Sequence, residues 1–222
     1  MASSTVNLTE LRNRYVGMQL TGDRRAALQF IEETLTAGVS VAELSTHVVA
    51  AAQREIGRLW QENRISIAQE HMATAISQLV LAHVFGQADF RGRVGKKILI
   101  ACVTGEYHDF PARLLADSLD LAGYDVRYLG ANVPLDSLLR MMDEERPDLL
   151  ALSVTMLFNL PALRETVKAV RSDERRRTLP IAIGGHAVQE TESLAQQLGV
   201  ELVAADTRDF VPQIDEFLGV TP

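Results

Sequence analysis

The first 90 residues carry hydrophobic positions at helical spacing. From Val41 to Leu59, apolar residues recur every three or four positions, which predicts a helix over about 41–60. Other stretches with helical character lie at about 7–20, 23–37 and 67–85. Short connections join these stretches, and short connections favour antiparallel neighbours. Residues 1–90 are therefore predicted to form an N-terminal four-helix bundle.

The pattern changes after residue 91, where short apolar runs alternate with amphipathic stretches. The apolar runs lie at 96–103, 125–131, 148–155, 179–185 and 200–206, and the amphipathic stretches at about 110–122, 135–146, 160–176 and 190–198. Strands that alternate with helices in this way indicate βαβ units. Residues 91–222 are therefore predicted to form a five-stranded parallel doubly wound sheet, flavodoxin-like, in an α plus α/β protein. The charged, glycine-containing segment 89–97 is predicted to be the linker.

Charge and composition exclude several function classes. The 222 residues have a formal net charge of -7, and the basic run at 171–177 is interrupted by acids, so direct nucleic-acid binding is not expected. No apolar run approaches the roughly 18 residues of a membrane span. The single cysteine, Cys102, excludes an internal disulfide, and the N-terminus lacks the apolar region of a secretion signal. We therefore expect a cytoplasmic protein that does not bind membranes.

Polar and small residues follow the predicted strands, at the edge where doubly wound folds bind ligands. They are Glu106, His108, Ser153, Thr155, Gly184 and Gly185. A carboxylate on one imidazole nitrogen fixes the tautomer and raises basicity toward a metal, so Glu106 and His108 are a candidate pair, with Ser153 orienting the carboxylate. One histidine cannot make a zinc site, which needs at least three protein ligands. It suits a metal whose other ligands come from a macrocycle.

These residues resemble the motifs of cobalamin-binding domains. The segment Glu106–Pro111 is similar to their Asp-x-His-x-x-Gly motif, Ser153–Thr155 to their Ser-x-Leu/Thr element, and Gly184–Gly185 to their Gly-Gly pair. The resemblance implies that His108 is the lower axial ligand of cobalt. It also implies that the nucleotide tail of cobalamin passes the serine and the glycines, where a Cβ would block it. Two positions depart from the motif, because glutamate replaces aspartate and Pro111 replaces glycine, so the loop backbone must differ locally.

Three aromatic residues lie near these motifs. Tyr107 and Phe110 are inside the histidine segment, and the resemblance makes both of them candidates to pack on the corrin ring. Phe158 follows the third predicted strand and is expected to belong to the hydrophobic core. His186 comes directly after the glycine pair and is a further candidate for contact with a ligand at the same edge.

The helical half carries a second pattern. Trp60 is followed after nine residues by Glu70 and His71, and the turn between lies near Ile65, so the three side chains are expected to face one pocket. The pattern resembles that of light-sensing adenosylcobalamin proteins of the CarH and LitR type, in which the tryptophan and glutamate cover the adenosyl group. It is also similar to stand-alone photocobilins, which hold a bilin, and that similarity makes biliverdin a candidate second cofactor. In CarH-type proteins a histidine follows the tryptophan, whereas Gln61 stands at that position here.

These resemblances leave several functions open. The main interpretation is a non-enzymatic light sensor that binds adenosylcobalamin, forms a dimer or tetramer, and acts on a regulatory protein partner. The alternative is a corrinoid protein that carries methyl groups between methyltransferases; it would share Glu106 and His108 and would not need Trp60 with Glu70. A third interpretation is an anti-repressor that binds cobalamin only to change its partner. The sequence does not identify the partner.

Overall fold

The chain folds as two compact units. A computed structural model describes residues 7–191, 193–204 and 207–220. Contacts between Cα atoms divide the chain into Met1–Asp89, which we call the helical unit, and Phe90–Pro222, which we call the sheet unit. Within the described ranges, no helix combines the length and the apolar content that a membrane crossing requires.

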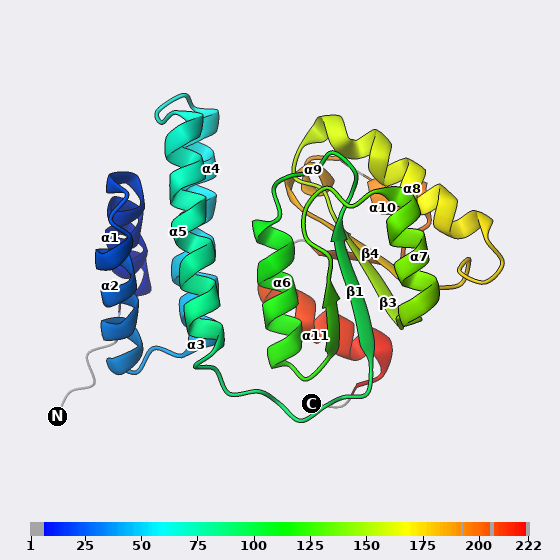
Figure 1. Cartoon of the computed structure of the whole chain (residues 1–222), viewed down its shortest axis with the longest axis horizontal. Helices are drawn as coiled ribbons and strands as arrows, with labels where there is room; N and C mark the ends of the chain where they lie inside the picture. Colours follow the sequence, from blue (N-terminus) through cyan, green and yellow to red (C-terminus); the bar gives the residue numbers. More distant parts are fainter. Residues whose placement is uncertain (1–6, 192, 205–206, 221–222) are drawn as a thin grey trace. The chain divides into compact units, whose positions relative to one another are not determined.

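The helical unit confirms the predicted helices. It contains α1 (Leu8–Thr21), α2 (Arg24–Thr36), an unbroken run of α3 (Val41–Glu43), η1 (Leu44–Ala50) and α4 (Ala51–Gln61), and α5 (Ile67–Phe85) (Figure 1). The α3 and α5 helices begin with capping boxes, at Ser40 with Glu43 and at Ser66 with Gln69. Apolar side chains from all of the longer helices fill the interior, among them Ile31, Val48 and Ile76. Burial of this shared core holds the helices together.

The η1 segment is a π-helix, which the hydrophobic pattern does not predict. A π-helical turn adds one residue to the helical repeat, and a three-and-four spacing of apolar positions tolerates that insertion. Leu44, Val48 and Val49 are still fully buried in this segment. The predicted helix over about 41–60 therefore has the right extent but contains a local irregularity.

The sheet unit confirms the predicted parallel sheet. Its strands are β1 (Lys97–Cys102), β2 (Asp125–Tyr128), β3 (Leu149–Ser153), β4 (Ile181–Gly184) and β5 (Leu202–Ala204). They pair in parallel in the order β2-β1-β3-β4-β5. The order in which successive strands are added to the sheet reverses at β1. The loops after β1 and β3 therefore lie next to each other at one edge of the sheet.

Helices cover both faces of this sheet (Figure 1). The helices are α6 (Phe110–Leu121), α7 (Leu135–Glu145), α8 (Leu160–Ser172), α9 (His186–Gln189), α10 (Leu194–Leu198) and α11 (Thr207–Leu218), with a short 3-10 helix, η2 (Leu157–Asn159), before α8. One hydrophobic core joins the sheet to α6 and α11, and a second core joins its other face to α7, α8 and α9. This two-layer burial explains why the strands are almost continuously apolar.

Three helix predictions need correction. The stretch predicted over 160–176 stops at Ser172, because Asp173 adopts an extended backbone and its carboxylate accepts a hydrogen bond from the Arg175 backbone at 2.9 Å. The stretch predicted as one helix over 190–198 is instead two short helices, α9 (His186–Gln189) and α10 (Leu194–Leu198). The sequence pattern predicts no helix near the C-terminal end, where α11 packs Phe210 and Ile214 into the core.

The segment predicted as a linker is held against the sheet unit from Arg91 onward. Backbone nitrogens of Arg91 and Val94 donate hydrogen bonds to the carbonyl oxygens of Leu121 and Gly123, at 2.9 and 3.0 Å. A Cβ on Gly123 would lie 2.2 Å from the Gly92 oxygen, so the close approach of the two backbones requires glycine there. The predicted linker is therefore anchored to the sheet unit over most of its length.

Candidate functional site

The candidate site is built on the carboxyl ends of β1, β3 and β4. In the sheet register, Cys102 lies beside Ser153, and Ser153 lies beside Gly184. The pairing continues past the strand ends, because the Val154 nitrogen donates to the Gly184 oxygen at 2.8 Å. The loops that follow these three strands therefore begin at the same level and lie next to each other.

Glu106 and His108 contact each other directly in the loop after β1. The Glu106 Oε1 atom accepts hydrogen bonds from the His108 backbone nitrogen at 2.9 Å and from its Nδ1 atom at 2.8 Å. An ionised carboxylate only accepts, so Nδ1 carries a proton, and in a neutral ring the lone pair would then belong to Nε2. The His108 side chain is 37% exposed, whereas the Glu106 side chain is fully buried. This is the arrangement that orients a histidine for metal ligation.

The second carboxylate oxygen of Glu106 is held by the loop after β3. Its Oε2 atom accepts hydrogen bonds from the backbone nitrogens of Thr155 and Met156 and from Nδ2 of Asn159, each at 2.9 Å. Burial alone would raise the pKa of Glu106, but the hydrogen bonds from His108, Met156 and Asn159 outweigh it and lower the pKa to about 2. The carboxylate is therefore ionised at neutral pH in spite of its burial.

Asn159 has the role predicted for Ser153, because it hydrogen-bonds the Glu106 carboxylate. The prediction that Ser153 orients Glu106 is wrong, because the donors to the two Glu106 oxygens come from His108, Thr155, Met156 and Asn159. Asn159 also donates to the Gly105 oxygen at 3.2 Å, so both acceptors fix the orientation of its amide. Asn159 is not part of any motif recognised in the sequence, because it lies six residues beyond Ser153. The available signal was an asparagine one residue before the start of α8.

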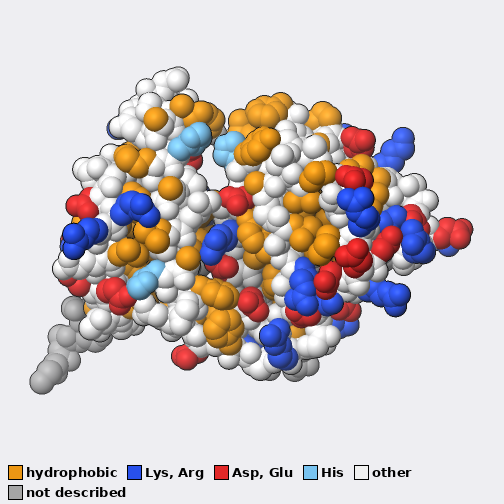
Figure 2. Space-filling model, in the orientation of Figure 1, with side chains coloured by type: hydrophobic (Ala, Val, Ile, Leu, Met, Phe, Trp, Pro, Cys, Tyr) orange, Lys and Arg blue, Asp and Glu red, His pale blue; other side chains and the backbone are white. Residues whose placement is uncertain are grey.

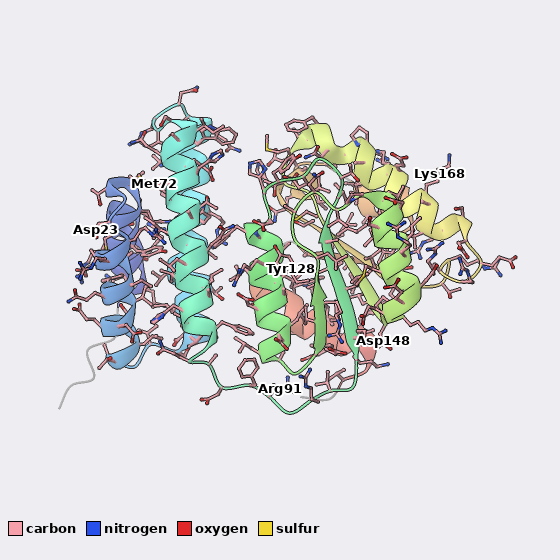
Figure 3. All side chains as sticks on the ribbon, in the orientation of Figure 1. Asp23, Met72, Arg91, Tyr128, Asp148 and Lys168 are labelled. Carbon is pink, nitrogen blue, oxygen red and sulfur yellow. The ribbon has the colours of Figure 1, made fainter. Side chains whose placement is uncertain are left out.

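Tyr128 supports the same loop from β2. The hydroxyl of Tyr128, a residue labelled in Figure 3, donates to the carbonyl oxygen and to the Oδ2 atom of Asp109, at 3.3 and 3.1 Å. Asp109 directly follows His108 and precedes the first turn of α6. The contact thus fixes the chain immediately after the histidine, and no motif in the sequence pointed to this tyrosine.

The glycine pair is required by the packing of the protein itself. Gly185 has a φ of 103°, and a Cβ there would lie 2.3 Å from the Val154 oxygen. A Cβ on Gly184 would lie 2.9 Å from the Ala204 Cβ of the neighbouring strand. Close approach within the sheet unit is therefore one cause for glycine at both positions, and the expectation that they also leave room for a cofactor tail stays a prediction.

Two features of the loop after β3 suit a bound ligand. The Thr155 Oγ1 atom is buried and has no hydrogen-bond partner in the described structure, which is unusual for a buried hydroxyl. Leu157 and Phe158 are 56% and 71% exposed, and Tyr107, in the adjoining loop, is 69% exposed. Figure 2 shows hydrophobic side chains gathered at this end of the sheet unit. The prediction that Phe158 belongs to the core is therefore wrong, and Phe110, expected on the corrin, is buried at the start of α6.

In the helical unit, the three residues of the Trp60 pattern differ in their surroundings. Trp60 is partly exposed near the end of α4, and His71 is largely exposed, with its Nε2 atom 3.7 Å from Glu70 Oε2. The Glu70 side chain is only 12% exposed and accepts a hydrogen bond from Thr74 Oγ1 at 2.8 Å. Within the described residues, no hydrogen bond joins Trp60 to Glu70 or His71, so their predicted common pocket stays a prediction.

No protein-only metal centre is present in the described ranges, which contain no group of three or more His, Cys, Asp or Glu side chains able to hold an ion.

Two family models match the chain: one described as a B12 binding domain over residues 96–214, and another with the same description over residues 11–84. The chain belongs to the B12-binding domain family. Since B12 is cobalamin, this confirms the expected cobalamin-binding module.

Relatives of this cobalamin-binding protein match along most of its length. The dimethylamine corrinoid protein 1 of Methanosarcina acetivorans is 23% identical over 214 residues, which cover 94% of this chain and 98% of that protein. An uncharacterized 20.5 kDa protein from the bchF-crtJ intergenic region of Rhodobacter capsulatus is 30% identical over 194 residues, or 84% of this chain and 96% of that one.

Solved structures show the same fold. The monomethylamine corrinoid protein of Methanosarcina barkeri has a TM-score of 0.81 at 16% identity and covers 95% of this chain and 100% of that chain. The methanol:cobalamin methyltransferase complex MtaBC of the same organism contains a chain with a TM-score of 0.52 at 19% identity, covering 96% of this chain and 81% of that one. At these identities the likeness supports a helical region followed by a Rossmann-like sheet domain.

The residues at the sheet edge fit a corrinoid. One oriented imidazole offers a single metal ligand, and a macrocycle would supply the remaining equatorial ligands. Exposed apolar side chains of Tyr107, Leu157 and Phe158 flank the histidine loop and suit a large, partly apolar ring. The unpartnered Thr155 hydroxyl would find a partner in a polar group of the cofactor.

Proposed function

We propose that the chain is a corrinoid protein in which His108 is the lower axial ligand of cobalt and Glu106 orients it. The 2.8 Å contact between His108 Nδ1 and a fully buried carboxylate carries this proposal. A bound corrinoid would supply a cobalt centre that takes up and releases an upper axial group. The protein fixes the ring tautomer, holds the carboxylate ionised, and keeps that carboxylate out of water.

The remaining residues at the sheet edge are proposed to bind the rest of the cofactor. Thr155 supports this role best, because its buried hydroxyl lacks a partner. Ser153, Gly184 and Gly185 lie at the same level and are proposed to border the nucleotide tail. We further propose that residues 91–222 are the cobalamin-binding domain and residues 1–90 its helical cap. Cys102 is buried as a free thiol, which fits a cytoplasmic location.

Methyl carriage is the use of the corrinoid that the relatives support best. The characterised relatives are named as corrinoid proteins of methylated amines, and one structural neighbour is named as a methanol:cobalamin methyltransferase complex. By this proposal the chain presents a cobalt-bound methyl group to a separate methyltransferase polypeptide. It would be a component of a catalytic system and would depend on that partner for the transfer.

Light sensing is a second candidate, and a specific observation favours it. Glu70 is a nearly buried carboxylate in the helical unit, spaced after Trp60 as in the CarH and LitR proteins that the pattern resembles. A methyl group gives such an acceptor nothing to bind, whereas the adenosyl group of adenosylcobalamin carries hydroxyls. This candidate assigns Trp60, Glu70 and His71 to the upper axial group, expects a dimer or tetramer acting on a regulatory partner, and leaves biliverdin as a second chromophore.

One experiment separates the candidates. The purified protein would be loaded in the dark with methylcobalamin or adenosylcobalamin, and its spectrum and size by light scattering would be recorded before and after green light. Retention of methylcobalamin alone supports methyl carriage. Retention of adenosylcobalamin, with a light-dependent change in oligomer size, supports sensing, and an added red band after biliverdin loading supports the bilin. Binding of neither cobalamin would overturn the proposed function.

A further inference from the structure

The loop that follows β2 holds the start of the segment that carries His108. The Gly105 backbone nitrogen donates to Asn132 Oδ1, and the Asn132 backbone nitrogen donates to the Glu106 carbonyl oxygen, both at 2.8 Å. Asn132 has a φ of 48°, in the left-handed region that residues other than glycine seldom adopt. A strained residue that makes two reciprocal hydrogen bonds beside a candidate site indicates a conformation that the site requires.

The end of the same segment is held by Tyr128, the last residue of β2. Its hydroxyl lies 3.3 Å from the Asp109 carbonyl oxygen and 3.1 Å from Asp109 Oδ2. A carbonyl oxygen can only accept, so the hydroxyl is the donor, and its single hydrogen is shared between the two oxygens. β2 and the loop behind it therefore hold the histidine segment at both ends.

The packing of α6 does not explain the contact between Asp109 and Tyr128. The Asp109 carbonyl oxygen already accepts from the Arg113 nitrogen at 2.9 Å. Asp109 stands at the N-cap of α6, where an aspartate commonly caps the helix, but its side chain makes no capping hydrogen bond. Pro111, in the first turn, lacks one of the backbone donors that a cap would serve. The carboxylate is turned toward Tyr128 instead, which fixes the residue next to His108 against β2.

We infer that Tyr128 and Asn132 are positioning residues, which hold the backbone of His108 where its imidazole can coordinate cobalt. The inference rests on the proposed corrinoid function. Glu106 fixes the direction of the ring through Nδ1, whereas the position of the ring also depends on the backbone that carries it. Partners that orient a metal ligand contribute to metal affinity without touching the metal. All of these residues belong to the sheet unit.

The test measures histidine coordination directly. Full-length protein labelled with nitrogen-15 would be loaded with cob(II)alamin and studied by electron paramagnetic resonance. A histidine from the labelled protein splits each cobalt line into a doublet, whereas the unlabelled base of the cofactor splits it into a triplet. The spectrum therefore gives the ratio of histidine-coordinated cobalt to the other forms. In Tyr128→Phe this ratio should fall about 3- to 10-fold, the size of one ordinary hydrogen bond.

Tyr124→Phe is the matched control. Tyr124 is fully buried, and its hydroxyl donates to Asp215 Oδ1 at 2.5 Å, so the substitution also removes a hydroxyl from a contact with an aspartate. Tyr124 directly precedes β2, whereas Tyr128 ends it, so the two contacts lie at opposite ends of the strand. Tyr124→Phe should lower the stability and keep the wild-type coordination ratio.

A double-mutant cycle tests whether Tyr128 acts through His108. Dissociation constants for cob(II)alamin would be measured for Tyr128→Phe with His108 present and in a His108→Ala background. The substitution should weaken binding when the histidine is present and have no effect when it is absent. An equal loss of affinity in both backgrounds would overturn the inference, because Tyr128 would then act on the cofactor by another route.

A second variant keeps the inference testable if Tyr128→Phe does not fold. Asn132→Gly accepts the positive φ and removes only the side-chain acceptor for the Gly105 nitrogen, so it should lower the coordination ratio in the same direction. Wild-type ratios in the folded variants, with stability alone altered, would overturn the inference and leave corrinoid binding intact. Failure of the wild type to bind cobalamin, or to show the doublet, would instead overturn the proposed function.

Discussion

Glu106 and His108 form two hydrogen bonds through one carboxylate oxygen, from the imidazole at 2.8 Å and from the backbone nitrogen at 2.9 Å. The backbone contact turns the loop so that the ring lies against the carboxylate only two residues away. The other oxygen is bound by three donors from the loop after β3. The histidine is consequently positioned by two strands of the sheet through a single buried side chain.

Replacement of His108 by alanine should remove imidazole coordination and leave the fold intact. The ring is 37% exposed but donates to a fully buried carboxylate, so its loss should lower the unfolding free energy by about 1–3 kcal/mol. Electron paramagnetic resonance of bound cob(II)inamide, a corrinoid without a nitrogenous base of its own, would report the histidine nitrogen through its hyperfine splitting. His83→Ala, at an exposed site paired with Glu32, is the control and should retain the splitting. A nitrogen signal that survives in His108→Ala would reject this residue as the lower ligand.

Replacement of Asn159 by leucine should destabilise the protein before any cofactor is bound. The change removes a donor from Glu106 Oε2 and leaves the Gly105 oxygen without its partner, which should cost about 1–3 kcal/mol. Urea unfolding of the cofactor-free protein would measure this loss. Asn13→Ala is a suitable control, because Asn13 is exposed and bonds only its neighbour Arg12. Equal stabilities of the two variants would mean that Asn159 does not hold the carboxylate.

The ionised Glu106 should make stability depend on acidic pH. Its pKa is lowered from 4.5 to about 2 in the folded protein, so folding favours the ionised form. The resulting stability is fully present above the unfolded pKa and is lost as pH falls from about 4.5 toward 2; it amounts to about 3 kcal/mol. Unfolding free energies of the wild type and Glu106→Gln between pH 6 and 2.5 would test this. The wild type should lose more stability on acidification, and parallel profiles would contradict the assignment.

The sequence predicts the fold well because the signals are local and repeated. Helical spacing from Val41 to Leu59 survives even the π-helix, and the apolar runs of β1, β3 and β4 reflect burial on both faces of a parallel sheet. The pairing of Glu106 with His108 is also local, since a single residue separates them in the sequence.

The prediction fails where distant residues meet. Asn159 reaches Glu106 across a sequence separation of 53 residues. The sequence around either residue gives no sign that the two side chains are in contact. The Gln19–Gln53 contact joins two helices whose polar positions look like ordinary solvent-facing ones in the sequence. Phe158 follows an apolar strand, which predicts a core position, but it lies in η2 and its side chain is exposed.

Replacement of Gly185 by alanine should unfold the sheet edge whether or not a cofactor is present. The residue has a φ of 103°, which side chains rarely tolerate, and its Cβ would lie 2.3 Å from the Val154 oxygen. Neither the backbone of β3 nor that of β4 can move away without breaking the sheet. We expect a loss of at least about 2 kcal/mol in the unfolding free energy of the cofactor-free protein.

A matched glycine separates this cause from a cofactor effect. Gly57 lies inside α4 with open space at its Cβ position, so Gly57→Ala should stabilise the helical unit by about 0.5–1 kcal/mol. Thermal unfolding of both variants without cobalamin, followed by titration with cobalamin, would distinguish the two explanations. If Gly185→Ala kept its full stability and lost only cobalamin affinity, the glycine would serve the cofactor rather than the sheet, and the packing explanation given for Gly185 would have to be withdrawn.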